Sequence, residues 1–218
     1  MASVVCWLFT DYTPEHSPLH SLIPWWNAAM RLGIFLLACG LIAYLKKTLD
    51  QERELARTDS VTGTANARSF MENLKRELER SRRNGQPFTL AYLDLDNFKE
   101  INDRLGHDAG DGVLRAVAEA VARDLRASDL VARLGGDEFA VLLPETGEAA
   151  ADEVLGRLRE RVLSSMSGGG WPVTPSIGAV TFWRLPESAD EALRLADEVM
   201  YAVKRAGKNA VRRETQGA

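Results

Sequence analysis

Four carboxylates stand where apolar runs of the chain meet polar sequence. Asp94 and Asp96 end one apolar run, and Asp137 and Glu138 begin another. If the two runs are neighbouring strands, the acids gather at one sheet edge, where their mutual repulsion costs stability. Bound Mg²⁺ or Mn²⁺, which prefers oxygen ligands, relieves that cost. Such a site, completed by substrate phosphates, is the usual arrangement for phosphoryl transfer.

Two glycines, Gly135 and Gly136, come immediately before the second acidic pair. Without side chains there, a large flat or anionic ligand can lie against the backbone. The alternative is an ordinary hairpin turn with an aspartate that caps a neighbouring group. Two acidic pairs, each beside an apolar strand, favour the metal site.

The segment 97–111 lies between the two acidic pairs. An amide such as that of Asn102 and a carboxylate such as that of Asp111 can together read a guanine edge, because the carboxylate accepts from N1–H and N2–H. The alternative is that Asp108 or Asp111 caps a helix. His107, beside a glycine, is interpreted as a structural turn residue.

These residues need a scaffold, and hydrophobic periodicity predicts one. The pattern indicates an α+β fold in which helices pack against one mixed sheet with an antiparallel hairpin at its centre. We expect helices over 67–83, 98–105, 111–126 and 147–166 and a last long helix ended by Gly207, and strands over 88–95, 130–134, 138–143, 173–182 and 210–212, with Gly135-Gly136 as the hairpin turn.

The composition is that of a folded protein. The chain has 218 residues, 45% of them hydrophobic, which excludes wholesale disorder. Its net charge of −4 makes it a poor candidate for coating nucleic acid, so no nucleic-acid partner is expected. Two cysteines, Cys6 and Cys39, cannot form a disulfide scaffold.

The N-terminal quarter has a different character. Residues 22–45 are apolar over a length that can span a bilayer, with Trp25 and Trp26 at one end and Lys46 and Lys47 at the other. The positive-inside rule places the C-terminal side of this run in the cytoplasm. The alternatives are a signal peptide, which the late start of the run disfavours, and a buried helix of a soluble protein.

The predicted organisation has four parts. A short segment, 1–21, precedes the membrane helix, 22–45. Residues 46–58 are good helix formers and are interpreted as a helical stalk, either a plain linker or the start of a coiled coil. Residues 59–218 form the globular domain, which is long enough to bury a full core.

Five segments of that domain resemble the GGDEF-domain diguanylate cyclases. They are Asp59–Gly63 (DSVTG), Asp94–Lys99 (DLDNFK), Asn102–Asp111 (NDRLGHDAGD), Arg133–Phe139 (RLGGDEF) and Tyr201–Asn209 (YAVKRAGKN), in the family's order and spacing. The resemblance implies a fold like the palm of nucleotide polymerases and nucleotidyl cyclases. It also implies an enzyme that condenses two GTP into cyclic di-GMP and two pyrophosphates.

The resemblance further implies a homodimer in which each subunit holds one GTP, whose 3′-hydroxyl attacks the α-phosphate of the other. Two Mg²⁺ or Mn²⁺ ions per active site would bind Asp94, the backbone carbonyl of Leu95, Asp137 and Glu138. Asp137 and Glu138 would be the catalytic pair, with Asp137 tied to activation of the hydroxyl. The implied membrane is the bacterial inner membrane, crossed once, with the enzyme domain in the cytoplasm.

The same resemblance assigns the substrate contacts. Asn102 and Asp111 would hold guanine, and the glycines 135 and 136 would let the nucleotide approach the backbone. The phosphates would be bound by the backbone N–H groups of Phe98 and Lys99 and by the side chains of Lys204 and Lys208.

A second site is suggested by Arg126-Ala-Ser-Asp129, which resembles the family's RxxD product-inhibition motif. An arginine can pair with phosphate through two hydrogen bonds or stack on guanine. Arg157, on the next predicted helix, is the expected second arginine. The alternative is a solvated helix end with a surface salt bridge.

The chain departs from the family at three positions. Thr64 stands where leucine is usual, and Ala67 and Lys208 stand where arginine is usual. The first two predict looser docking of segment 59–66. Two other functions stay open: an inactive domain that senses cyclic di-GMP, and a GTP- or ATP-sensing domain. Retention of all five residues Gly135–Phe139 favours the enzyme.

Overall fold

The computed structural model describes residues 23–55 and 57–217, and the chain divides into two compact units, 1–56 and 57–218. In the first unit the described residues form one helix, α2 (Ile23–Leu55). Its segment Trp25–Lys46 is long and apolar enough to cross a membrane, by length and composition alone. The predicted segment 1–21 lies outside the described residues.

The helix covers less of the predicted stalk than expected. It ends at Leu55, and Thr58 instead forms an antiparallel bridge with Ala65 in the second unit. Helix propensity alone could not reveal this boundary, because it is set by backbone pairing that begins at Arg57, whose carbonyl accepts from the N–H of Asn66.

The second unit is built on a six-stranded mixed sheet, as predicted, in the order β1-β3-β4-β2-β5-β6. Strand β2 pairs antiparallel with β4 on one side and with β5 on the other, and β3 pairs antiparallel with β4. The two edge strands are parallel to their neighbours: β1 joins β3, and β6 joins β5. The strands are β1 (Ala65–Asn66), β2 (Phe88–Asp96), β3 (Leu130–Gly135), β4 (Glu138–Leu143), β5 (Thr174–Phe182) and β6 (Val211–Gln216).

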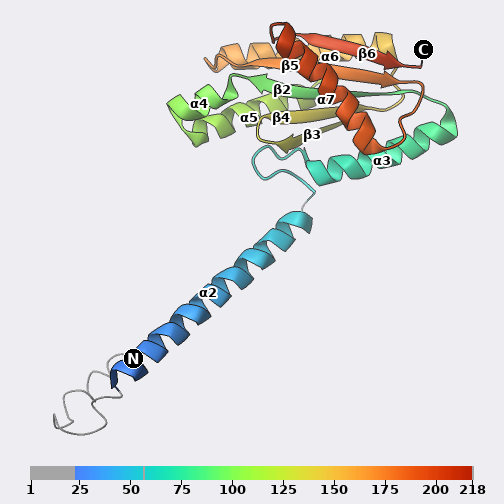
Figure 1. Ribbon diagram of the computed structural model, residues 1–218. Helices are drawn as coiled ribbons and strands as arrows, with labels where there is room; N and C mark the ends of the chain where they lie inside the picture. The colour runs from blue at the N-terminus through green and yellow to red at the C-terminus, as the bar shows by residue number, and fades with distance from the viewer. Residues whose placement is uncertain (1–22, 56, 218) are drawn as a thin grey trace, which may run out of the picture. The chain divides into compact units, whose positions relative to one another are not determined.

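Helices cover both faces of this sheet (Figure 1). Helices α3 (Ala67–Asn84) and α7 (Ala189–Ala206) close one apolar layer, and α4 (Phe98–Leu105), α5 (His107–Ala122) and α6 (Glu148–Gly168) close the other. Every residue of β2 is buried, because this central strand packs against helices on both faces.

Close packing fixes α7 on β5. A Cβ atom at Gly178 of β5 would lie 2.0 Å from the backbone nitrogen of Met200. Only glycine therefore permits this approach of helix to strand. The position of α7 sets where its last turn, including Lys204, meets the end of β2.

Two local predictions, and the alternative that Asp108 or Asp111 caps a helix, were wrong. Helix α5 begins at His107 and not at 111, because Gly106 (φ 85°) turns the chain directly from α4 into α5. Asp108 and Asp111 thus lie inside the helix and do not cap it. The hairpin turn is Gly136-Asp137 and not Gly135-Gly136, since Gly135 pairs with Glu138 across a register shift. Strand β1 is too short for any periodicity to predict.

Candidate active site

The acidic groups at the ends of β2 and β4 lie on the α3/α7 side of the sheet. Asp94 and Glu138 are directly opposite each other in the antiparallel register, and Asp137 belongs to the adjoining turn. Burial, together with the negative charges of Asp137 and Glu138, raises the pKa of Asp94. The structure thus places at one end of the sheet the three carboxylates that the resemblance named as metal ligands.

A lysine neutralises this buried carboxylate. Lys204 of α7 places its Nζ 2.6 Å from Oδ2 of Asp94, whose side chain is 8% exposed. Tyr92, two residues earlier on the same strand face, donates its hydroxyl to Glu138, and burial and the charge of Glu138 raise the pKa of this phenol. The cluster therefore combines three carboxylates with one cation and one neutral donor.

Asp96 is separate from that cluster, contrary to the prediction that it would join Asp94. Its two oxygens accept hydrogen bonds from the hydroxyls of Thr174 (2.8 Å) and Ser176 (2.9 Å) and from the backbone N–H of Asn209 (3.1 Å). Asp96 is 3% exposed, so these bonds use the carboxylate internally. It ties β2 to β5 and to the loop before β6.

The donor set suits a hard divalent cation without forming a finished cage. Within 23–55 and 57–217, no three or more His, Cys, Asp or Glu side chains converge closely enough to hold a metal. Mg²⁺ commonly takes only one or two carboxylates and completes its shell with water and substrate phosphates. The chemistry of Asp94, Asp137 and Glu138 fits that mode of binding.

An arginine network positions the glycine turn between β3 and β4. Nε of Arg133 donates to the carbonyl of Gly136 (2.9 Å), and its NH1 lies 3.2 Å from Asp59. Gly136 has φ 51°, a conformation that glycine adopts without strain. Arg133 belongs to the segment Arg133–Phe139, but its role in positioning the glycine turn was not predicted from the sequence.

Asp59 links this network to the start of the domain. It accepts the backbone N–H of Thr62 at 2.9 Å. Burial opposes ionisation of Asp59, but hydrogen bonds from Thr62 and Arg133 outweigh it and lower its pKa. The unusual Thr64 joins the same turn through a 2.9 Å contact between its hydroxyl and that of Thr62. These hydrogen bonds hold the 59–64 segment against the Arg133 side chain.

The two predicted guanine ligands lie at the corner between α4 and α5. A Cβ atom at Gly110 would lie 2.0 Å from Oδ1 of Asn102, so the Asn102 side chain rests directly against the start of α5. Asp111 follows Gly110 in the chain, and its carboxylate lies 3.8 Å from Arg115. The missing side chain at 110 therefore lets the Asn102 amide of α4 pack against the first turn of α5, one residue before Asp111.

Positive groups gather at the start of α4. Its N-cap residue, Asn97, adopts φ 63° and makes no side-chain capping bond to the first-turn N–H groups, which include those of Phe98 and Lys99. The Asn97 amide oxygen instead accepts from Nζ of Lys208 at 3.1 Å. Uncapped N–H groups at a helix start attract anions, and an ammonium nearby adds to that attraction.

Comparisons of the sequence with known proteins point to one protein family. Residues 56–210 match the family model described as "Diguanylate cyclase, GGDEF domain". The chain belongs to the GGDEF-domain diguanylate cyclase family. It is 39% identical over 164 residues to diguanylate cyclase DgcP of Pseudomonas aeruginosa, covering 74% of this chain and 24% of DgcP. It is 39% identical over 177 residues to response regulator PleD of Caulobacter vibrioides, covering 77% of this chain and 38% of PleD.

A solved structure of the coiled coil and GGDEF domain of DgcB from Caulobacter crescentus, in complex with c-di-GMP, is similar to this GGDEF protein. The TM-score is 0.66 at 29% identity, and the match covers 86% of this chain and 100% of that one. The chain spans about a quarter of DgcP and less than two fifths of PleD. The relatives thus carry further regions that this match does not reach.

The RxxD segment of this GGDEF protein forms a closed turn. The carboxylate of Asp129 accepts from the backbone N–H of Arg126 at 2.8 Å, and the Asp129 N–H donates back to the Arg126 carbonyl at 3.0 Å. Arg161 of α6 forms an ion pair with Asp124, just before this turn. Arg157, one turn earlier on α6, lies 3.9 Å from Glu153.

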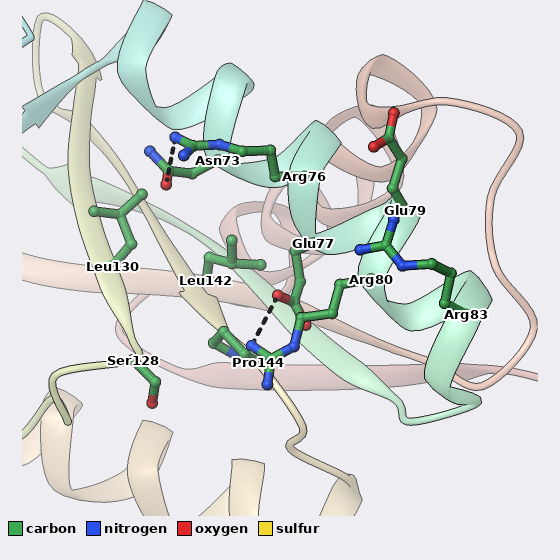
Figure 2. A pocket seen from close by; sticks show the side chains of 10 residues that line it. All are labelled: Asn73, Arg76, Glu77, Glu79, Arg80, Arg83, Ser128, Leu130, Leu142 and Pro144. Atoms are coloured by element: carbon green, nitrogen blue, oxygen red, sulfur yellow. Dashed lines mark hydrogen bonds and ion pairs between the residues drawn. The ribbon is translucent and has the colours of Figure 1, made fainter.

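A cavity of about 410 Å³ lies between α3 and this turn (Figure 2). Leu130, Leu142 and Pro144 supply apolar lining, and Ser128 of the RxxD turn contributes a hydroxyl. The α3 side of the cavity carries charges of both signs, on Arg76, Glu77, Glu79, Arg80 and Arg83, together with the amide of Asn73. These three arginines were not predicted as a group, although they recur at helical spacing along one helix.

Proposed function

We propose that this chain is a diguanylate cyclase, which condenses two GTP molecules into cyclic di-GMP and two pyrophosphates. The carrying observation is the cross-strand pair Asp94–Glu138, with Asp137 in the adjoining turn and Lys204 at the Asp94 carboxylate. The pairing of β2 with β4, and not side-chain flexibility, brings these groups to one end of the sheet. Family membership supports the same reaction.

The nucleotide is recognised at two places in this proposal. Asn102 and Asp111 bind the guanine edge, where the amide and the carboxylate complement its donors and acceptor. Gly135 and Gly136 let the nucleotide approach the backbone. The triphosphate is bound at the start of α4 and by the lysines, which neutralise charge that phosphoryl transfer concentrates there. The phosphate-binding groups are the N–H groups of Phe98 and Lys99 and the side chains of Lys204 and Lys208.

The metal-binding residues are proposed to be Asp94, the Leu95 carbonyl, Asp137 and Glu138, for two Mg²⁺ or Mn²⁺ ions. Pro175 lies opposite Leu95 in the sheet and has no N–H to donate to that carbonyl. When bound, such cations neutralise the triphosphate and lower the pKa of the attacking hydroxyl. Asp137 and Glu138, at the glycine turn, are the residues placed to orient that hydroxyl.

The reaction needs two copies of the domain. Each copy offers binding groups for one GTP, and the 3′-hydroxyl that attacks its α-phosphate comes from the GTP of the other copy. A homodimer is therefore the proposed active form. The segment 22–45 is proposed to anchor the chain once in the inner membrane, preceded by 1–21 and followed by the stalk, with the 59–218 domain in the cytoplasm.

Product inhibition is proposed at the RxxD turn. Arg126 and Asp129 are the primary contacts, and Arg157 on α6 is the second arginine. Cyclic di-GMP carries two phosphates and two guanines, which arginine side chains bind by paired hydrogen bonds and by stacking. The α3 cavity beside Ser128 places further arginines within the same region.

The test is a product assay on the full chain in detergent, with GTP and Mg²⁺. We expect cyclic di-GMP to form with GTP and not with ATP, and Asp137→Ala to reduce the rate by at least about 1,000-fold while circular dichroism stays unchanged. Glu119→Ala, which removes an exposed carboxylate of α5, should retain the rate. Full activity of Asp137→Ala, or no product from the unaltered chain, would reject the proposal.

A further inference from the structure

The ion pair between Lys204 and Asp94 joins two groups that need different partners in the proposed reaction. Nζ of Lys204 and Oδ2 of Asp94 are 2.6 Å apart in the protein alone. Asp94 is assigned to a divalent cation, and Lys204 is assigned to a nucleotide phosphate. An ammonium and a divalent cation on the same carboxylate repel each other strongly at such short range. The observed pair therefore opposes binding of a cation to the same carboxylate.

The surroundings of Asp94 explain why the lysine is needed in the free protein. Asp94 is 6% exposed, and burial and the charges of Asp137 and Glu138 all disfavour its ionised form. A buried carboxylate without a counterion is costly, and removing one partner of such a pair leaves that cost uncompensated. Lys204 is held within reach because α7 is packed tightly on β5 at Gly178.

We propose that Lys204 is an exchangeable counterion, which holds the Asp94 carboxylate until a cation–nucleotide complex replaces it. This rests on the proposed function, in which Asp94 is a metal ligand. A divalent cation that arrives alone must displace the tethered ammonium, which then loses its partner. A cation that arrives with a triphosphate offers the ammonium a phosphate instead. Cation and nucleotide therefore bind with positive coupling, and the cation alone binds weakly.

The experiment measures Mn²⁺ binding to the full chain in detergent without nucleotide, from the loss of the free Mn²⁺ signal in electron paramagnetic resonance. Lys204→Met should bind Mn²⁺ about tenfold more tightly than the unaltered chain. Lys204→Arg, which retains a cation at Asp94, should bind as weakly as the unaltered chain. Arg205→Met removes the same charge from the exposed neighbour of Lys204 on α7, and should leave Mn²⁺ affinity unchanged.

A second readout separates the contact from general charge effects. In metal-free buffer, Lys204→Met should unfold at a lower temperature than the unaltered chain, and Mn²⁺ should raise its unfolding temperature by more. Arg205→Met should show neither change.

The outcomes separate this proposal from the proposed function. Equal or weaker Mn²⁺ binding by Lys204→Met overturns the exchange. If the double variant Lys204→Met with Asp94→Asn then no longer binds Mn²⁺, the exchange proposal fails but the assignment of the metal to Asp94 stands. If Mn²⁺ binding by the double variant is the same as by Lys204→Met, the cation is not at Asp94 and both proposals fail.

Discussion

The active-site end of the sheet and the RxxD region position their charged groups by opposite means. At the active-site end, Asp94 and Glu138 are short side chains whose separation is set by strand register. In the RxxD region, defined here as the 126–129 turn and the α3 cavity, the charged groups are long arginines on a helix surface. The side chain of Asp94 is 8% exposed, whereas that of Arg80 is 44% exposed.

This difference suits two different tasks. Chemistry requires reacting groups to be placed to within a fraction of an ångström, which short side chains on paired strands provide. Binding a polyanion for inhibition requires charge and adaptable reach, which arginines provide. Each region also has its own ion pairs: Lys204 neutralises Asp94, while Glu77 and Glu145 pair with Arg80.

The largest effect after loss of the catalytic acid is expected at Gly110, which tests the precision of the active-site end. In Gly110→Ala the new methyl group overlaps Oδ1 of Asn102, at 2.0 Å, and the end of a flexible side chain can rotate away. Stability should change little, but the displaced amide should no longer reach guanine. We expect KM for GTP to rise roughly 10- to 100-fold and the preference for GTP over ATP to shrink, as measured by initial rates.

Gly112→Ala is the matched control, because its new methyl group would meet only the Trp171 ring at an ordinary 3.8 Å. It should leave KM unchanged. If Gly110→Ala kept the KM and the base preference of the unaltered chain, the corner between α4 and α5 would not be the guanine site.

A smaller effect is expected in the RxxD region, where several cations share the task. Arg80→Ala should raise the cyclic di-GMP concentration for half-maximal inhibition about tenfold, because one charged contact to phosphate is lost. Initial rates without added product should stay the same. Lys75→Ala, an exposed lysine of the same helix that does not line the cavity, is the control. Unchanged inhibition in Arg80→Ala would exclude Arg80 from the inhibitory site.

The sequence predicted most of the active-site end because its signals are local. An acidic residue next to an apolar run marks the end of a strand. One run that ends in acids and one that begins with acids together predicted the approach of Asp94 to Glu138. The roles of Asp94 and Asp96 could not be separated, since they depend on Thr174, Ser176 and Asn209, far along the chain. Nor could sequence place the hairpin turn, because the register shift between Arg133 and Gly135 moves it by one residue.

The RxxD region was predicted less well for a physical reason. Arginines along α3 are indistinguishable in sequence from those of any solvated helix face, and only the fold shows Ser128 and Pro144 beside them. The link between Arg133 and Asp59 was missed similarly, because its partners are 74 residues apart. Charged side chains carry no periodic signal that reveals a distant partner.

The smallest effect is expected at Glu77, which lies in the cavity wall and is 7% exposed. Burial raises its pKa above the usual 4.5, and the attraction of Arg80, 3.6 Å away, does not cancel this. A folded protein that holds this proton more tightly than the unfolded chain loses stability as pH rises from 4.5 through the folded pKa.

Replacing this carboxylate with an amide removes that loss. Glu77→Gln should therefore raise the unfolding temperature at pH 7 by a few degrees, roughly 2 °C, and leave it nearly unchanged at pH 4, where the carboxyl is protonated in both states. Thermal unfolding followed by circular dichroism measures both. Glu79→Gln, exposed on the same helix, should show no such difference. A lower unfolding temperature for Glu77→Gln at pH 7 would show that the ion pair with Arg80 outweighs the burial of Glu77, and the RxxD region would then resemble the active-site end, where a buried carboxylate depends on its cation.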